Sequence, residues 1–264
     1  MHHNCVCLKW RGTGFGNALI MAHLTRILND NGINAVYGGH FKTDGLVDVP
    51  LWTKENKNCF VYYKGFPSTY YVKVYDEPVI TMYLRDLSTI INVKLAFNRD
   101  IHNHVPIIYE DMPNIPYIDV VMNTKTGPWA PCRDWPHFSE LKKLLDMENI
   151  SYIDLNLENK MSIECLNYVN KSKLYLGLET GMSHYVSKYA NGKTIILQGG
   201  FAPFYYWAYP YNYDYITATV TCKYRPCGMD RKMMLNGVNC LSNYACMSEI
   251  TPEVVLEAIL RRIR

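Results

Sequence analysis

Hydrophobic positions along the chain switch between two periods, and the alternation predicts a repeating α/β arrangement. Short apolar runs rich in β-branched and aromatic residues predict strands, whereas apolar residues three or four positions apart predict helices. Strands are predicted at 5–10, 34–37, 117–122, 152–155, 174–178 and 194–197. Helices are predicted at 17–31, 82–97, 138–147, 163–169, 182–190 and 251–264. Strands that alternate with helices in this way are typical of doubly wound parallel sheets.

The order of these elements predicts two Rossmann-like units, residues 1–114 and 115–264. Pro113 and Pro116 interrupt the chain between them and suit an interdomain linker. The pattern between 38 and 116 is weak, and only the helix at 82–97 is well indicated there. The second unit reads as four strands alternating with three helices.

Composition narrows the class of protein. The 264 residues are 48% hydrophobic and 19% charged, and they include 22 Tyr, 8 Phe and 5 Trp, which is typical of a folded globular protein. A net charge of +3 favours an anionic ligand without indicating nucleic acid. No signal peptide or membrane span is apparent, so we expect a cytoplasmic protein, in a bacterium or a phage-infected cell. Nine cysteines, an odd number, argue against a full disulfide framework.

The stretch 173–200 carries the clearest candidate site. It reads as strand, tight turn, helix, turn and strand, with Thr180 placed to cap the helix. The free backbone N–H groups of a helix N-terminus bind phosphate well. His184 lies one turn into the same helix and can lean toward the same place. We therefore expect an anion to bind above the end of the strand at 174–178.

A glycine turn, Gly12-Thr13-Gly14-Phe15-Gly16-Asn17, follows the first strand. Three glycines at alternate positions permit a tight turn and close approach of a ligand to the backbone, and Asn17 can cap the next helix. The turn lacks the last glycine of the dinucleotide-binding fingerprint. A strand-to-helix turn with no ligand explains it equally well.

Three further features leave alternatives open. The aromatic segment 201–215 either stacks on a base or sugar ring or covers an edge of the core. His102 and His104 lack a third metal ligand at a suitable spacing, so surface histidines are expected. The tail has the spacing C-x4-C-x12-C-x5-C, which suggests either a structural zinc site or free thiols, the latter being favoured. Its members are Cys222, Cys227, Cys240 and Cys246.

Taken together, these motifs resemble glycosyltransferase family 9, the heptosyltransferase-like enzymes of lipopolysaccharide synthesis. The segment 179–184, ETGMSH, is similar to the family's acidic-Ser/Thr-Gly-x-x-His element, and 133–136, RDWP, is similar to its basic-Trp-Pro segment. The glycine turn at 12–17 and the cysteine-bearing tail match in the same order. The resemblance implies a GT-B fold of two facing Rossmann-like domains with a cleft between them.

The resemblance also implies an inverting, metal-independent transfer from a nucleoside-diphosphate sugar, with no cofactor. The acceptor would lie on the first domain, at Gly12, Thr13, Gly14, Phe15 and Gly16, and the donor on the second. The donor would contact Glu179, Thr180, Gly181, Met182, Ser183 and His184. Lys125 and Arg133 would reach its phosphates, because a diphosphate leaving group needs positive charge and N–H donors nearby.

One position departs from the family. Asn17 stands where the family usually has a carboxylate that deprotonates the acceptor hydroxyl, and an amide cannot act as a base. We expect the base to come instead from one of three residues that follow the second strand, Asp44 first, or else His40 or Asp48. The leading acceptor is a surface glycan. One alternative is a hydroxylated base in DNA, and another is a nucleotide-sugar binding module without catalysis.

Overall fold

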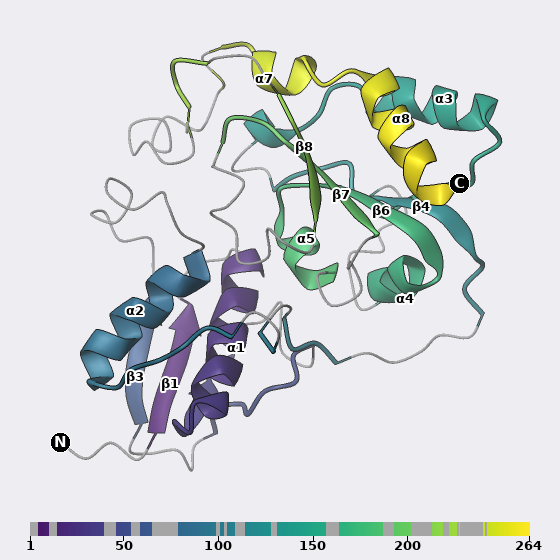
Figure 1. The fold of residues 1–264 in the computed structure, drawn as a ribbon. Helices are drawn as coiled ribbons and strands as arrows, with labels where there is room; N and C mark the ends of the chain where they lie inside the picture. The colour runs from purple at the N-terminus through teal and green to yellow at the C-terminus, as the bar shows by residue number, and fades with distance from the viewer. Residues whose placement is uncertain are drawn as a thin grey trace.

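The computed structural model describes most of the chain in ordered segments, and every statement below refers to these residues. They are 5–10, 15–39, 46–53, 59–64, 79–98, 101–102, 105–108, 114–127, 131–156, 164–186, 193–201, 213–218, 222–225, 227, 240 and 242–264. They form two separate parallel sheets, each packed against helices (Figure 1). The predicted α/β class is confirmed.

The first sheet has three parallel strands in the order β2-β1-β3. These are β1 (Cys5–Trp10), β2 (Ala35–Tyr37) and β3 (Cys59–Lys64), and the helices are α1 (Phe15–Asp30) and α2 (Val79–Ile91). Side chains alternate along β1: Val6 and Leu8 join the core cluster that contains α1 and α2, whereas Cys5 and Cys7 cluster with Val36 on the other face. Both helices therefore share a core with the same face of this sheet.

The second sheet has five parallel strands in the order β5-β4-β6-β7-β8. The strands are β4 (Ile118–Met122), β5 (Tyr152–Asp154), β6 (Ser172–Leu178), β7 (Thr194–Gln198) and β8 (Asp214–Thr217). The helices are α3 (Phe138–Met147), α4 (Glu164–Asn170), α5 (Gly181–Tyr185), α7 (Ala245–Ser248) and α8 (Pro252–Ile263), with a 3-10 turn, η2 (Pro131–Arg133).

Alternate residues of the second sheet face different helices. Leu174 and Leu176 join a cluster with α3 and α8, whereas Tyr175 joins a cluster with α4 and α5. The helices therefore cover both faces, as the doubly wound pattern predicted. Thr251 caps α8 by accepting a hydrogen bond from the Val254 backbone N–H, as the sequence around it suggests.

Both sheets reverse their strand order at their first strand. β1 lies between β2 and β3, and β4 lies between β5 and β6. Ligands of open α/β sheets bind at the carboxyl ends of the strands beside such a reversal. The topology therefore directs attention to the residues that follow β1, β4 and β6.

One apolar cluster runs through both parts of the chain. It contains Leu19 and Leu24 of α1 as well as Val121 of β4 and Tyr185 of α5. All strands of the first sheet precede residue 114, and all those of the second follow it. The division at 114/115 into two domains stays a prediction.

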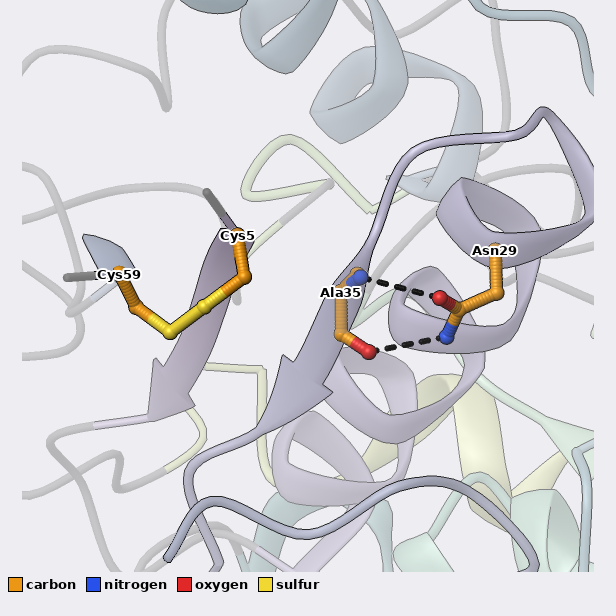
Figure 2. Close-up of a disulfide and its surroundings, with 4 residues drawn as sticks. All are labelled: Cys5, Asn29, Ala35 and Cys59. Atoms are coloured by element: carbon orange, nitrogen blue, oxygen red, sulfur yellow. Dashed lines mark hydrogen bonds between the residues drawn. A yellow bond between two sulfur atoms is a disulfide. The ribbon is translucent and has the colours of Figure 1, made fainter. Parts of the chain in front are cut away.

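Two side-chain links hold elements of the first sheet together, one between β1 and β3 and one between α1 and β2 (Figure 2). Cys5 and Cys59 lie opposite each other on β1 and β3 and form a disulfide. The Asn29 side chain exchanges two hydrogen bonds with the backbone of Ala35, at 2.9 and 3.0 Å, which ties the end of α1 to β2. The other seven cysteines are free, so the expectation of no full disulfide framework is confirmed.

Several elements differ from prediction. α1 begins at Phe15, so Asn17 lies in its first turn rather than capping it. α2 ends at Ile91 rather than 97, where Asn92 takes a left-handed φ of 53°. The expectation of surface histidines was wrong for His102, which is buried with its Nε2 3.0 Å from Asp30 Oδ2; His104 lies outside the described residues.

The end of the aromatic segment overlaps a strand that the sequence pattern did not reveal, β8, at the edge of the second sheet. Its burial pattern does not alternate cleanly, which is why period-2 reasoning missed it. Among the described residues, no helix is both long and apolar enough to cross a membrane.

Candidate functional site

The candidate site begins where β4 and β6 end, side by side, at the reversal of the second sheet. Asn123 follows β4 and is fully buried. Its backbone N–H donates to the Leu176 carbonyl of β6, and its side-chain Nδ2 donates to Thr180 Oγ1 at 3.1 Å. The two loops are therefore joined by a direct hydrogen bond at the point where the topology places a ligand.

Thr180 does not cap α5 in the way the sequence suggested. It occupies the N-cap position with extended backbone, but its hydroxyl makes no capping bond and accepts from Asn123 instead. The helix is described only over Gly181–Tyr185, and 187–192 lie outside the described residues. Binding of a phosphate by these N–H groups stays a prediction.

The start of α5 is packed directly against the start of α1. A Cβ added to Gly181 would lie 2.6 Å from the backbone N of Gly16, and one added to Gly16 would lie 3.1 Å from the Gly181 Cα. Next to this contact, the rings of Phe15 and Tyr185 meet edge to face, with centroids 5.6 Å apart. The loops that follow β1 and β6 thus lead into two helices whose first turns touch.

Ser183 forms buried hydrogen bonds within the protein. Its hydroxyl donates to the Leu178 carbonyl at 2.6 Å, and its own carbonyl accepts a hydrogen bond from the Tyr213 hydroxyl. Both bonds are buried. In this structure the side chain of Ser183 therefore holds the turn after β6, although it was predicted to contact the donor.

A small pocket opens beside this turn. With a volume of about 10 Å³ it has room for a single water molecule. Its lining joins the predicted donor motif to two tyrosines from the aromatic segment: Glu179, Thr180, Ser183, His184, Ile196, Tyr213 and Tyr215. No individual tyrosine was predicted here, although stacking on a base or sugar ring was one of the two interpretations of the aromatic segment.

Arg133 binds the backbone of the predicted donor segment 179–184. It is buried, donates from Nη1 to the Glu179 carbonyl, and lies over the Phe201 ring at 4.7 Å from its centroid. Lys125 is 68% exposed, and its Nζ lies 3.6 Å from Asp134 Oδ2. The predicted pair of phosphate-binding cations is therefore split between one buried and one exposed side chain.

The electrostatic surroundings keep His184 neutral. Burial, followed by the positive charge of Arg133, lowers the pKa of His184 to about 4. At neutral pH the imidazole is therefore uncharged and retains one N–H donor. Glu179 is also buried, and its Oε2 lies 3.5 Å from the Nε2 of Gln198.

The predicted acceptor side is only partly described. Gly12, Thr13, Gly14, His40 and Asp44 lie outside the described residues. Phe15, Gly16 and Asn17 form the first turn of α1, and Asn17 is half-buried there. The identity of the catalytic base stays a prediction.

Two cysteines of the tail, Cys227 and Cys240, lie near a thiol that the metal prediction did not include, Cys132. A hydrogen bond with Cys227 lowers the pKa of Cys132, which stands next to Arg133. Within the described part of the chain, no three Cys, His, Asp or Glu side chains gather closely enough to hold a metal ion. The alternatives for the tail, zinc site or free thiols, both stay predictions.

Comparison with known proteins shows which solved structures have a similar fold. No protein-family model and no curated protein matches the chain. Among solved structures, the dodecameric iron-containing glycosyltransferase TibC from enterotoxigenic E. coli H10407 is 12% identical, with a TM-score of 0.66 over 100% of this chain and 77% of its own. A glycosyl transferase family 9 protein from Veillonella parvula is 11% identical, with a TM-score of 0.62 over 99% and 98% of the two chains.

E. coli heptosyltransferase WaaC with ADP is 11% identical, with a TM-score of 0.56 over 97% of this chain and 99% of its own. At these identities the likeness concerns the fold. The chain therefore shares the fold of heptosyltransferases and of a family 9 glycosyltransferase.

Proposed function

We propose that this chain is a glycosyltransferase that moves a sugar from a nucleoside-diphosphate sugar to a hydroxyl group of a surface glycan. The observation that carries the proposal is the junction of Asn123 with Thr180 at the reversal of the second sheet, packed against α1 through Gly181. The likeness to TibC, which has been crystallised with ADP-D-beta-D-heptose, supports a nucleotide sugar as donor.

The donor-side residues suit a departing diphosphate. Negative charge builds on the leaving oxygen, and fixed positive charge and N–H donors stabilise it. Arg133 supplies positive potential through the Glu179 peptide. Lys125 adds a surface ammonium group that is paired with Asp134, and the neutral imidazole of His184 carries one N–H. These side chains need no metal to do this, in line with the metal-independent transfer that the family resemblance implies.

The transfer is a single displacement with inversion. A base on the acceptor side takes the hydroxyl proton, the hydroxyl oxygen bonds to the anomeric carbon, and the bond from that carbon to the diphosphate oxygen breaks. We propose Asp44 as this base, with His40 as the next candidate, because Asn17 cannot accept a proton in this way.

Asn17 also favours a second candidate function, a nucleotide-sugar binding module without catalysis. Hydrolysis and transfer assays distinguish the two, using a panel of nucleotide sugars in the presence of EDTA. Activity that survives EDTA and Asn17→Ala but is lost in Asp44→Ala supports the transferase. Binding of a nucleotide sugar with no turnover of any donor supports the module.

The third possibility, a modified DNA base as acceptor, gains no support. It requires lysines and arginines grouped around the site. The two predicted phosphate-binding cations, Arg133 and Lys125, are engaged with the Glu179 carbonyl and with Asp134.

TibC is described as iron-containing, which gives the tail cysteines a specific test. We propose that any metal this protein holds is bound by Cys222, Cys227, Cys240 and Cys246 and has a structural role. Metal analysis of the purified protein and of Cys240→Ser measures this directly. Metal content unchanged in the variant would contradict the assignment.

A further inference from the structure

The loop that follows β4, residues 123–126, has each of its backbone N–H groups bonded within the protein. The acceptors are, in chain order, the Leu176 carbonyl, Asn156 Oδ1 for two successive N–H groups, and Asp134 Oδ1, at 2.9, 2.7, 3.2 and 2.8 Å. Each residue has one backbone N–H, so a bonded one is not available to a phosphate group. What this loop offers to an anionic ligand therefore comes from its side chains, above all from the exposed ammonium group of Lys125.

The base of the loop is held by a buried carboxylate. The Thr124 hydroxyl donates to Asp154, and its Oγ1 lies 2.9 and 2.8 Å from the two carboxylate oxygens. Lys142 of α3 places its Nζ 2.8 Å from Asp154 Oδ2, and the Asp154 side chain is 5% exposed. Hydrogen bonds to an ionised group are stronger than those between neutral groups. Lys125 therefore extends from a segment whose backbone is firmly held.

Asp134 contacts the same loop with both of its carboxylate oxygens. Oδ1 accepts hydrogen bonds from the backbone N–H and the hydroxyl of Thr126, at 2.8 and 2.6 Å. Oδ2 lies 3.6 Å from the Nζ of Lys125. Asp134 itself stands just after η2, where its N–H donates to the Pro131 carbonyl at 2.9 Å. One side chain thus aligns the loop and pairs with its ammonium group.

The two contacts of Asp134 differ in their need for charge. Accepting from Thr126 requires an oxygen atom but no negative charge, whereas the contact with Lys125 is electrostatic. The side chains of Lys125 and Asp134 are 68% and 28% exposed, and ion pairs of this kind are weak. A diphosphate carries more negative charge than one carboxylate, so it can take the ammonium group from Oδ2 while Oδ1 keeps its bonds to Thr126.

We infer that Asp134 is a positioning residue that also weakens the hold of the site on the leaving nucleotide. Through Oδ1 it keeps the loop in place, and through Oδ2 it competes with the diphosphate for Lys125. When a nucleoside diphosphate departs, the carboxylate pairs with the ammonium group again, which favours release. Product release limits the turnover of many enzymes. The inference rests on the proposed function and adds a control of product release at the same site.

Two substitutions of Asp134 separate alignment from charge. Calorimetry and stopped-flow dissociation on the full chain measure binding of ADP, UDP, GDP and CDP, and of inorganic pyrophosphate, which has neither base nor sugar. Asp134→Asn keeps an oxygen that accepts from Thr126 but loses the charge. We expect it to bind the diphosphate about twofold to fivefold more tightly, through slower dissociation, with a gain that shrinks as salt rises. Asp134→Ala also loses the alignment and should bind less tightly than Asp134→Asn.

The gain should depend on Lys125. In a Lys125→Met background, Asp134→Asn should leave the affinity unchanged, because no ammonium group remains to compete for. Glu148→Gln is the matched control for charge. It removes one negative charge just beyond the end of α3, where Glu148 Oε2 lies 2.7 Å from Arg264, and should also leave the affinity unchanged.

Nucleotide binding that Asp134→Asn leaves unchanged or weakens would overturn the inference and leave the proposed function standing. An equal gain in the Lys125→Met background, or equal affinities of Asp134→Asn and Asp134→Ala, would overturn it as well. If pyrophosphate binds in the predicted order but no nucleotide binds, the inference holds and the result counts against a nucleotide-sugar donor. If the wild type binds none of these compounds, both the inference and the proposed function are wrong.

Discussion

Gly16 and Gly181 touch backbone to backbone, and through this contact the first turns of α1 and α5 meet. A Cβ on Gly181 would stand 2.6 Å from Gly16 N and 3.0 Å from Phe15 Cδ1. Real Cβ atoms do not approach backbone so closely, so any larger residue at position 181 would force one of the two helices to shift. The two glycines, far apart in sequence, are therefore a single structural feature that joins the glycine turn to the donor motif.

Gly181→Ala should separate the two helices and destabilise the protein. Forcing a methyl group into a closed contact costs about 1–3 kcal/mol. Chemical denaturation measures the loss, and donor affinity should fall with it. Gly32→Ala is a matched control, because Gly32 has open space around it but a φ of 77°, so alanine costs about 1 kcal/mol through backbone strain alone. Equal effects on donor affinity in both variants would contradict the role of the contact.

Thr180→Val should be costly even though the two side chains have nearly the same shape. Valine leaves the buried Nδ2 of Asn123 without the partner it has at 3.1 Å, and such a group costs about 1–3 kcal/mol. A double-mutant cycle with Asn123→Ala measures the coupling. The exposed Thr89→Val serves as control and should stay within about 0.5 kcal/mol of the wild type. A coupling energy near zero would show that this hydrogen bond does not stabilise the contact between the two loops.

Arg133→Met should raise the pKa of His184. The guanidinium is the second cause, after burial, of the low pKa of this imidazole. Removing the charge leaves the burial, so the pKa should rise while staying below the ordinary value of 6.5. NMR titration of the His184 ring protons follows the change, with Arg26→Met, on the far end of α1, as control. A pKa that falls or does not move would contradict the electrostatic account of Arg133.

Stability should decrease as the pH falls from 7 to 5, and His184 should account for part of the decrease. The folded protein keeps this imidazole neutral down to a pKa of about 4, whereas the unfolded chain takes up a proton near pH 6.5. The unfolded state then binds more protons, so stability is fully present above pH 6.5 and is lost toward pH 4. By pH 5 the loss is about 2 kcal/mol.

His184→Asn removes this contribution but leaves the other titrating groups, including the buried His102, in place. Denaturation curves of the wild type and the variant at pH 7, 6 and 5 should therefore converge as the pH falls. Parallel curves, with a constant difference at every pH, would show that His184 is not held neutral in the folded protein.

The fold could be predicted from sequence where a segment has a strong period and clear ends. α3 matches its predicted bounds because Phe138, Leu141 and Leu145 repeat at helical spacing and are buried. β8 escaped prediction because its edge position leaves its side chains half-covered and its pattern irregular. The position of His102 also escaped, because only the fold brings Asp30 close enough to bind it.

The candidate site divides in the same way. The segment 179–184 could be found because a strand, a turn and a helix follow one another locally. Its partners could not, since Asn123, Tyr213 and Gly16 are brought to it by strand order and helix packing. The inward hydrogen bonds of Thr180 and Ser183 likewise depend on neighbours that no local pattern reveals.

The most direct measurement for the account is a thermal-shift titration of the wild type and His184→Ala with nucleotide sugars that differ in base and sugar. The account predicts that one donor class stabilises the wild type, by about 2.7 kcal/mol at a hundred times its Kd, and stabilises the variant much less. If no nucleotide sugar shifts the melting temperature, or if His184→Ala responds as the wild type does, the donor site proposed around 179–184 is wrong.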